Sequence, residues 1–538
     1  MLFILCLAKF LIVKSVQQEY FMARYKKYDY NQTVLLPVSL ENQLEIGTLE
    51  YAINKLVDEK IDRSIFDKNY QNDETGSPAY DPKLLLKVVL LSYSRGITGS
   101  RKIEKACKEN IIFMALSCGI SPDHSTINNF ISSMKDGIIT IFRDILLYCE
   151  ELDLLGGSHF SLDGCKLPSN ASKEWSGTFK DLKRKRYKLE QKVRNLMIDH
   201  EREDARHTES EHKQSRRRVK RLNQQIERID RFLEENEPKE GKSKKEIQSN
   251  ITDNESAKMP TSHGVIQGYN VQALADEKHQ IIVHAEAMGN GQDSDNLKPM
   301  IDGAKENMET IGKGSDYFEG KTFSADANYH NNNNIKICEE EKMDAYIPDG
   351  GFRKRDERYQ NQERFRDGVT KRPKKTNHKT KQKIFTWEEF EYDEEQKKYK
   401  CPNGKYLNQQ SLHHKLRNKV YEYYRAKEAD CRKCALRGKC LSKESGKARG
   451  LLIPKGYRED REEHITYSQQ MQRKIDTDIG KEIYSKRLGI IEPVFANIRY
   501  QKGLDRFTFR GKVKVNIQWM LYCLVHNIEK IANYGLAV

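Results

Sequence analysis

The feature that most constrains this fold is a pair of heptad-spaced apolar seams within the highly charged residues 180–236. Spacings of three and four place apolar side chains on one face of a helix. A polar stretch separates the two seams, which predicts a helical hairpin packed on itself, within an insertion spanning residues 173–258. The segment 234–250, EENEPKEGKSKKEIQSN, is predicted to be a disordered linker. The seams consist of Leu189, Val193 and Leu196, then Val219, Leu222, Ile226, Ile229 and Leu233.

Helices are also predicted before the hairpin, in an N-terminal domain over residues 22–150. Asp81 is a plausible N-cap, and Pro82 stands at the first helical position ahead of an apolar run. Farther along, a turn from Cys118 to Pro122 separates two helical segments, the second from about Ser125. This spacing fits a helix-turn-helix, whose second helix enters the DNA major groove. It fits equally well an all-helical domain without a DNA role, so both interpretations stay open.

The segment before Met22 has a different composition. It begins with MLFILCLAKFLIV, an apolar run that Lys9 interrupts. A membrane span needs about twenty apolar residues, and a signal peptide needs a basic start and a small-residue cleavage site. Neither pattern is met, so residues 1–21 are interpreted as an upstream extension outside the fold, and no membrane partner is expected.

Short strands are predicted around two aspartates. The segment HFSL, residues 159–162, is predicted to end at Asp163, and KTFSAD is predicted to end at Asp326. Two longer strands, GVIQGYNVQALAD and HQIIVHAEAM, are predicted between them because β-branched runs alternate with turn residues. A helix is expected to begin near Asn331. Strands and helices together indicate an α+β multidomain protein.

Carboxylates at such positions suit metal-dependent chemistry. Divalent ions such as Mg²⁺ prefer carboxylate oxygens, and two ions about 4 Å apart can activate a nucleophile and stabilise a leaving oxygen. Asp163 and Asp326 follow strands, and Glu492 lies in a segment with helical periodicity. Taken singly each is a weak signal, because an aspartate after a strand often serves only a turn.

The chain is basic, with 94 Lys and Arg against 79 Asp and Glu and a net charge of +15. Such charge favours polyanionic partners, nucleic acid first, although an ordinary basic protein also fits. Residues 351–383 alone carry 13 Lys and Arg against 4 Asp and Glu. This segment is either a solvated loop or a loop that contacts phosphates. Basic residues also surround Glu492, and the predicted DNA contacts there are Arg487, Arg499, Lys502, Arg506, Arg510, Lys512 and Lys514, together with Tyr484.

Four of the eleven cysteines cluster within residues 401–440: Cys401, Cys431, Cys434 and Cys440. Four thiolates are a preferred ligand set for structural Zn²⁺. The first arm lacks the second cysteine of a usual pair, so a small insert with reduced cysteines is the alternative. The chain has no secreted disulfide pattern, and a reducing cytoplasmic location is expected.

Four longer motifs stand out along the chain: SLDGCKLPSNASK, GVIQGYNVQALADEKHQIIVHAE, SADANYHNNNNI and YSKRLGIIEPVFANIRYQKGLDRFTFRGKVKV. Together they resemble the motifs of bacterial insertion-sequence transposases of the DDE type, closest to the group numbered eleven-eighty-two. The resemblance runs from about Met22 to Ile531. Related transposases carry a Tyr–Arg–Glu–Lys signature, which Tyr484, Arg487 and Glu492 match loosely, with Arg499 where a lysine is expected.

The resemblance implies a ribonuclease H-like catalytic core in which Asp163, Asp326 and Glu492 bind two Mg²⁺ or Mn²⁺ ions. It implies cleavage of double-stranded DNA at the terminal inverted repeats of a mobile element and joining of the 3′ ends to target DNA, by a homodimer on DNA. The alternatives are a ribonuclease H-like nuclease and an inactive, repurposed DNA-binding protein. The expected core consists of residues 151–172, 259–350 and 481–538, with a basic, cysteine-containing insertion over 351–480.

Overall fold

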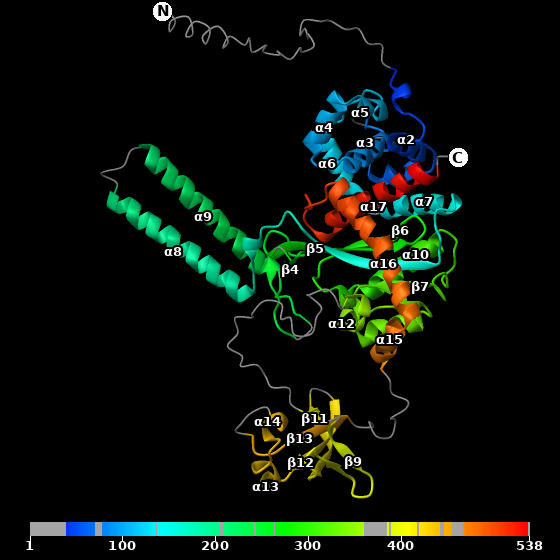
Figure 1. The fold of residues 1–538 in the computed structure, drawn as a ribbon. Helices are drawn as coiled ribbons and strands as arrows, with labels where there is room; N and C mark the ends of the chain where they lie inside the picture. The colour runs from blue at the N-terminus through cyan, green and yellow to red at the C-terminus, as the bar shows by residue number, and fades with distance from the viewer. Residues whose placement is uncertain are drawn as a thin grey trace, which may run out of the picture.

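In the computed structural model, the residues that the structure describes are 39–69, 78–135, 137–203, 209–241, 244–262, 264–359, 385–386, 389–416, 419–441, 446–454 and 466–535. The predicted extension, residues 1–21, and most of the basic segment 351–383 lie outside them. None of the described helices is long and apolar enough to cross a membrane. Figure 1 shows a central body from which a long helical hairpin projects, and a separate module of short strands.

The N-terminal region is helical, as predicted. Asp81 caps α3, because its Oδ1 accepts a hydrogen bond from Lys83 N at 2.8 Å and Pro82 occupies the first turn. Apolar faces of these helices share one core with the central sheet. The helices are α2 (Leu49–Glu59), α3 (Pro82–Ser94), α4 (Ser100–Glu109), α5 (Ile111–Leu116), α6 (His124–Ser133) and α7 (Gly137–Glu151).

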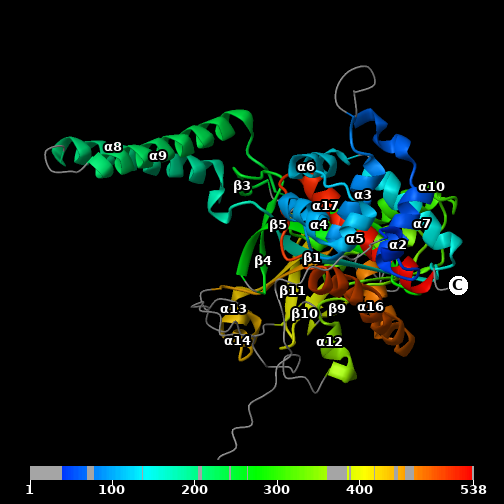
Figure 2. The ribbon, with the colours of Figure 1, turned by 90° about the horizontal axis from the view of Figure 1, so that it is seen from above.

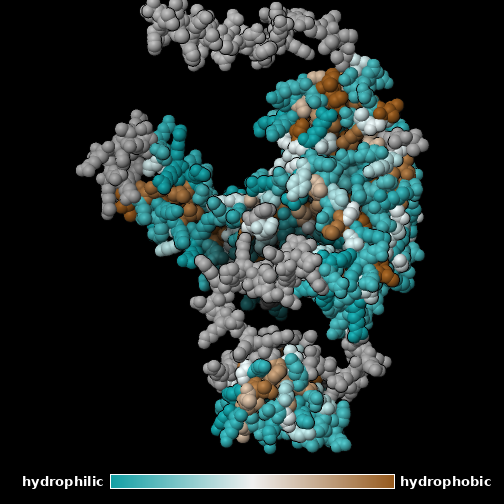
Figure 3. All heavy atoms as spheres, viewed as in Figure 1, coloured by the Kyte–Doolittle hydropathy of each residue, from teal (hydrophilic) through white to brown (hydrophobic). Residues whose placement is uncertain are grey.

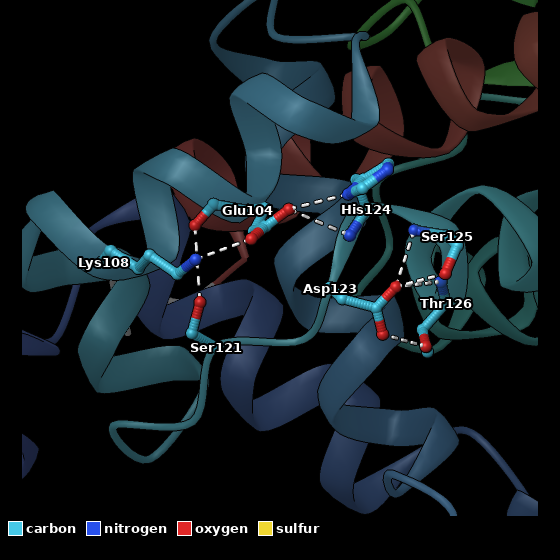
Figure 4. A network of polar contacts seen from close by, with 7 residues as sticks. All are labelled: Glu104, Lys108, Ser121, Asp123, His124, Ser125 and Thr126. Carbon is cyan, nitrogen blue, oxygen red and sulfur yellow. Dashed lines mark hydrogen bonds and ion pairs between the residues drawn. The ribbon is translucent and has the colours of Figure 1, made fainter.

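The two helices predicted around the turn from Cys118 to Pro122 are present as α5 and α6. Cys118 and Gly119 have positive φ values of 50° and 76°, which turn the chain between α5 and α6. Asp123 caps α6 through Ser125 N at 2.8 Å and Thr126 N at 3.1 Å (Figure 4). Glu104 on α4 accepts a hydrogen bond from His124 N at 3.1 Å, which fixes the start of α6 against α4. A role in DNA contact stays a prediction.

The central sheet has six strands in the order β4-β5-β1-β7-β8, with β6 also paired to β5. β1 runs antiparallel to β5 and parallel to β7, and β7 runs parallel to β8. All of β5 after its first three residues is buried, as expected for a strand that is covered on both faces. The strands are β1 (His159–Pro168), β4 (Ala257–Thr261), β5 (Gly264–Asp276), β6 (Ile282–Met288), β7 (Thr322–Ala325) and β8 (Asp344–Tyr346).

One strand boundary differs from the prediction. β1 does not end at Asp163 but continues to Pro168, so this aspartate lies in the middle of the strand. The strand continues because Gly164 to Pro168 pair with residues of β5, out to Pro168 opposite Gly268. For Asp326 the prediction is confirmed, since β7 ends at Ala325 and Asp326 caps the next turn.

Helices cover the sheet and one of its edges. α10 (Leu297–Thr310) and α17 (Lys512–Tyr534) pack on β6, and α16 (Asp478–Ala496) packs on β1 and β5. α17 also contacts α2, α3 and α7, so it lies between the sheet and the N-terminal helices (Figure 1). The side chain of Asn527 bonds both the N–H and the C=O of Ile282, each at 2.9 Å. α17 thereby satisfies two backbone groups of β6.

The predicted helical hairpin is confirmed as α8 (Phe179–Glu203) and α9 (Glu209–Glu235), which project away from the body (Figures 1 and 2). Its core is small, with Leu182, Leu189, Ile229 and Phe232 as the buried residues. Hydrophobic surface shows on the projecting hairpin in Figure 3. Met197 on α8 is exposed.

Parts of the segment 234–250, which its composition predicted to be a disordered linker, form ordered contacts in the described residues. Ser249 and Asn250 form β3, which pairs with β2 (Ser176–Gly177). Asn250 Nδ2 donates to Ser172 O at 2.8 Å, and Phe179 N donates to Glu246 Oε1 at 2.5 Å. These contacts across the base of the hairpin supply the pairing that a composition argument could not include.

The cysteine-containing part of the predicted insertion forms a five-stranded antiparallel sheet in the order β13-β12-β11-β10-β9. Its own apolar cluster includes Phe390, Tyr399, Leu407 and Tyr424. Figure 1 shows this module apart from the central body. Its elements are β9 (Glu391–Asp393), β10 (Lys398–Lys400), β11 (Tyr406–Leu416), β12 (Lys419–Ala426), α13 (Glu428–Arg432), α14 (Arg437–Cys440) and β13 (Gly450–Pro454).

Candidate functional site

The sheet brings two of the three predicted carboxylates together. Leu162 on β1 is paired with Ala325 on β7 in parallel register, and the residues that follow them are Asp163 and Asp326. Burial raises the pKa of Asp163, and the charge of Asp326 adds to the rise. Two segments far apart in sequence therefore place one carboxylate on β1 and another directly after the neighbouring strand β7.

A buried arginine from α16 contacts this pair. Arg487 Nη2 lies 2.6 Å from Asp163 Oδ2, with 5% of the arginine side chain and 24% of the aspartate side chain exposed. Burial raises the pKa of Asp163 to about 6, and Arg487 offsets part of that rise. Arg487 thus holds the Asp163 carboxylate in place.

Asp326 is oriented by the turn that follows β7. Its Oδ1 accepts a hydrogen bond from Ala327 N at 2.7 Å, and its Oδ2 accepts one from Asn328 Nδ2 at 3.2 Å. Asp326 is the N-cap of η5 (Ala327–Tyr329), which fixes the direction of the side chain.

A third aspartate near the pair was missed from the sequence. Asp293 begins η4 (Asp293–Asp295), between β6 and α10, and its charge also raises the pKa of Asp163. Asn328 Nδ2 lies 3.3 Å from Asp293 Oδ2, so one amide contacts both Asp293 and Asp326. No local motif marked Asp293, although it follows a predicted strand in the Gly-rich segment GNGQDSD.

Glu492 lies on the predicted helix but is exposed. The buried face of α16 includes Tyr484, Arg487, Ile491 and Val494, and Glu492 stands beside that face. Its charge raises the pKa of Arg487, which places it in the electrostatic neighbourhood of the site. In the described residues, no hydrogen bond or ion pair joins Glu492 to Asp163 or Asp326.

The helix that carries Glu492 is irregular beyond it. Pro493 lies inside α16 and cannot donate a backbone hydrogen bond, and Gly489 O, one turn earlier, accepts from Gln280 Nε2 at 3.4 Å. A π-helical turn, Asn497–Gln501, then ends the helix. Such turns are frequent at functional sites.

Two family models match the chain. The model described as Transposase DDE domain matches residues 400–532, and the model described as Transposase domain (DUF772) matches residues 38–133. Both segments are transposase domains. The matches are consistent with a bacterial insertion-sequence transposase of the DDE type, the family that the sequence resembles. No curated protein and no solved structure matches the chain.

The two transposase domains cover different parts of the structure. The DUF772 match spans α2 to α6, and the DDE match includes Glu492, α17 and the four clustered cysteines. Asp163 and Asp326 lie outside both matched ranges. Their place in the site therefore depends on the sheet geometry.

The basic residues predicted to contact DNA fall into two groups. Arg506, Arg510 and Lys514 are exposed, and Arg499 and Lys512 are half-buried. Arg506 Nε and Arg510 Nε donate to Ser169 O and Asn170 O, each at 2.9 Å, which ties this segment to the chain just after β1.

Three of the residues predicted to contact DNA lie where they do not reach the surface. Lys502 is 2% exposed, and its Nζ is 2.6 Å from Glu529 Oε2. Tyr484 is buried, with its ring 5.4 Å from that of Phe352, and Arg487 is bound to Asp163. Each of these three side chains is engaged by a partner inside the protein. Their contact with DNA stays a prediction.

The four clustered cysteines face one another in the strand module. All four line a single small cavity between the β-sheet and α13 and α14. Lys405 N donates to Cys401 Sγ at 3.3 Å. Burial raises the pKa of Cys440, and the other three cysteines add to the rise. The four cysteines that cluster in the sequence therefore line one cavity in the fold.

No metal site is recognisable in the described residues, since no group of three or more His, Cys, Asp or Glu there is arranged to hold an ion. The ligand types nevertheless fit. Asp163 and Asp326 offer hard oxygens that suit Mg²⁺, and the cysteines offer sulfurs that suit Zn²⁺. Asp163 Oδ2 is bound to Arg487, so a metal and this arginine would compete for one oxygen.

Proposed function

We propose that the protein is a DNA transposase that cuts at the terminal inverted repeats of an insertion sequence and joins the 3′ ends to target DNA. The observation that carries this proposal is the side-by-side position of Asp163 and Asp326 on parallel strands, beneath the helix that bears Arg487 and Glu492. The two transposase-domain matches support the general class. The mixed sheet, with β1 at its centre, supports a ribonuclease H-like core.

Asp163, Asp326 and Glu492 are proposed to hold two Mg²⁺ or Mn²⁺ ions. When bound, such ions activate the attacking oxygen and stabilise the leaving one. The protein's part is to orient the carboxylates. Asp163 is fixed by Arg487, and Asp326 is fixed by Ala327 N. Glu492 would join from its exposed position on α16.

DNA is proposed to contact the exposed basic residues after α16. Arg506, Arg510 and Lys514 lie close in sequence to the site helix, and Arg506 and Arg510 are anchored beside the end of β1. Phosphate contacts of this kind position a duplex without reading its sequence. Each end of the element needs such a surface, so a homodimer on DNA is proposed, with the cysteine module stabilised by Zn²⁺.

The test is cleavage of DNA that carries the stretches flanking this gene, with and without Mg²⁺. Asp163→Asn and Asp326→Asn are expected to lower the rate by at least about a thousandfold, because each removes a proposed metal ligand and charge stabilisation of the transition state commonly dominates catalysis in such sites. Asp302→Asn is the matched control, since Asp302 is half-exposed on α10 and paired with Lys298.

Metal-dependent cuts at matched inverted repeats, followed by joining, are the expected result for the wild type. Cuts without joining would favour a nuclease. If wild type and variants bind the DNA and none of them cleaves it, the enzyme proposal is overturned and a repurposed DNA-binding protein is favoured.

A further inference from the structure

Asp293 has contacts that a simple turn residue does not need. Its Oδ1 accepts hydrogen bonds from Asn270 Nδ2 at 2.7 Å and Gln272 Nε2 at 3.3 Å. Its Oδ2 lies 3.3 Å from Asn328 Nδ2. Three amide groups, two from β5 and one from the turn after β7, therefore converge on one carboxylate.

The two amides from β5 are held rigidly. Asn270 and Gln272 are both fully buried. The Tyr329 hydroxyl donates to Gln272 Oε1, and this directs Gln272 Nε2 toward Asp293. Trp519 Nε1 donates to Gln272 O at 3.1 Å, which fixes the backbone of the same residue. A buried polar network in which the donors are fixed specifies one position for the acceptor.

Space for this arrangement is provided beside Asp163. A Cβ atom at Gly164 would lie 2.2 Å from Gln272 Nε2 and 2.9 Å from Asp293 Oδ1. Only a residue without a side chain lets Gln272 and Asp293 approach β1 at this point. The glycine that follows Asp163 therefore admits the third aspartate to the site.

Asn328 connects Asp293 to the proposed metal ligand Asp326. Its Nδ2 lies 3.2 Å from Asp326 Oδ2 and 3.3 Å from Asp293 Oδ2, and an amide has two hydrogens to share between them. The rigid network on β5 thus extends through Asp293 and Asn328 to Asp326. Partners of ligating carboxylates of this kind commonly set metal affinity.

We infer that Asp293 is a positioning residue of the carboxylate site: through Asn328 it orients Asp326, and its charge favours a divalent cation there. This inference rests on the proposed metal-dependent function. It assigns to the site a fourth acidic residue beyond Asp163, Asp326 and Glu492. It also explains why a buried polar scaffold on β5 converges at this position.

Binding of Mn²⁺ to the full chain, followed by electron paramagnetic resonance of the free ion, tests this inference without relying on activity. Asp293→Asn is expected to raise the Mn²⁺ dissociation constant about tenfold, the lower end of the range for such partners. Asp326→Asn is expected to abolish tight binding. Asp295→Asn is the matched control, because it removes the same charge from the same turn.

A second variant separates positioning from charge. Asn328→Ala removes the bridge to Asp326 but leaves the contacts from Asn270 and Gln272 to Asp293 in place, and Asn328 is exposed, so the fold should tolerate the change. It is expected to weaken Mn²⁺ binding by severalfold. DNA binding without metal should be unchanged in both variants, which a general loss of structure would not allow.

The inference is overturned if Asp293→Asn and Asn328→Ala both bind Mn²⁺ as Asp295→Asn does. In that outcome the loss of binding in Asp326→Asn still supports the proposed function. A wild type that binds no Mn²⁺, or an Asp326→Asn variant that binds it like the wild type, overturns the metal site and this inference together.

Discussion

The helical hairpin and the central sheet differ in how their contacts are distributed along the chain. In the hairpin, α8 and α9 are neighbours in sequence and pack through a small apolar cluster. In the sheet, the hydroxyl groups of Ser161 and Ser324 bond across β1 and β7 although they are 163 residues apart. The hairpin is a local structure, and the sheet is a long-range one that places the carboxylates.

They also differ in charge. The hairpin segments 179–198 and 213–235 contain 16 Lys and Arg against 6 Asp and Glu. β5, by contrast, is buried over most of its length and ends at Asp276. A substitution that destabilises the sheet should therefore unfold the central body and disrupt the site. A substitution that destabilises the hairpin should unfold α8 and α9 alone.

The largest expected difference in stability is between substitutions that leave a cavity in the core of the central body and those that leave one in the hairpin core. Leu274→Ala in β5 should lower the free energy of unfolding of the central body by roughly 2–5 kcal/mol, because Leu274 is 1% exposed and its removal leaves a cavity. Ile229→Ala in α9 creates a cavity in the small hairpin core. We expect it to speed amide hydrogen exchange in α8 and α9 only.

Hydrogen exchange followed by mass spectrometry distinguishes the two. If Ile229→Ala also speeds exchange in β1 and β5, the hairpin and the sheet unfold as one unit and the comparison fails.

Acid should destabilise the sheet region next. Burial lowers the pKa of His284 to about 4, so this side chain is neutral in the folded protein. The unfolded chain binds a proton below about pH 6.5, and the stability contributed by His284 is therefore lost as pH falls from about 6.5 to 4. The loss reaches about 3 kcal/mol at most.

Urea unfolding of wild type and His284→Leu between pH 4 and 7 measures this contribution. The variant should show a shallower loss of stability with acid, and equal slopes would contradict the assignment. His526, whose pKa burial lowers to about 3, should keep part of the slope in the variant.

The smallest expected effect is that of salt concentration on the stability of the hairpin. The excess positive charges on the hairpin repel one another, and dissolved ions screen this repulsion. Raising NaCl from about 20 mM to 500 mM should stabilise α8 and α9 against exchange by up to about 1 kcal/mol and leave β5 unchanged. Arg217→Gln, at an exposed position on α9, should reduce the salt response. Equal salt responses in the hairpin and the sheet would count against a charge effect.

The same contrast explains what the sequence could and could not predict. Periodic spacing within α9 and the β-branched residues of β5 are local signals, so both elements were placed correctly. The end of β1 was misplaced, because its second half exists through pairing with β5. The disorder predicted for the segment 234–250 is wrong for Ser249 and Asn250 for the same reason, since these residues form β3 and pair with β2 across the hairpin base.

The site shows the same limit. Asp326 follows the end of a strand that the sequence predicted. Asp163 was proposed from its motif, because its predicted place at a strand end differs from its place within β1. Asp293 was missed because its relevance arises from Asn270, Gln272 and Asn328, which approach it only in the folded chain. Lys502 was predicted to contact DNA because it lies in a basic segment, and its pairing with Glu529 arises only in the folded chain.

The position of α17 has a consequence for how the protein is made. Ribosomes deliver this helix after every strand of the central sheet, yet Asn527 satisfies the outer backbone groups of β6. Until α17 emerges from the exit tunnel, that edge remains open and the N-terminal helices lack their main partner on the sheet side. A premature stop codon before residue 512 would therefore yield a chain with an exposed edge strand, which would tend to aggregate or be degraded.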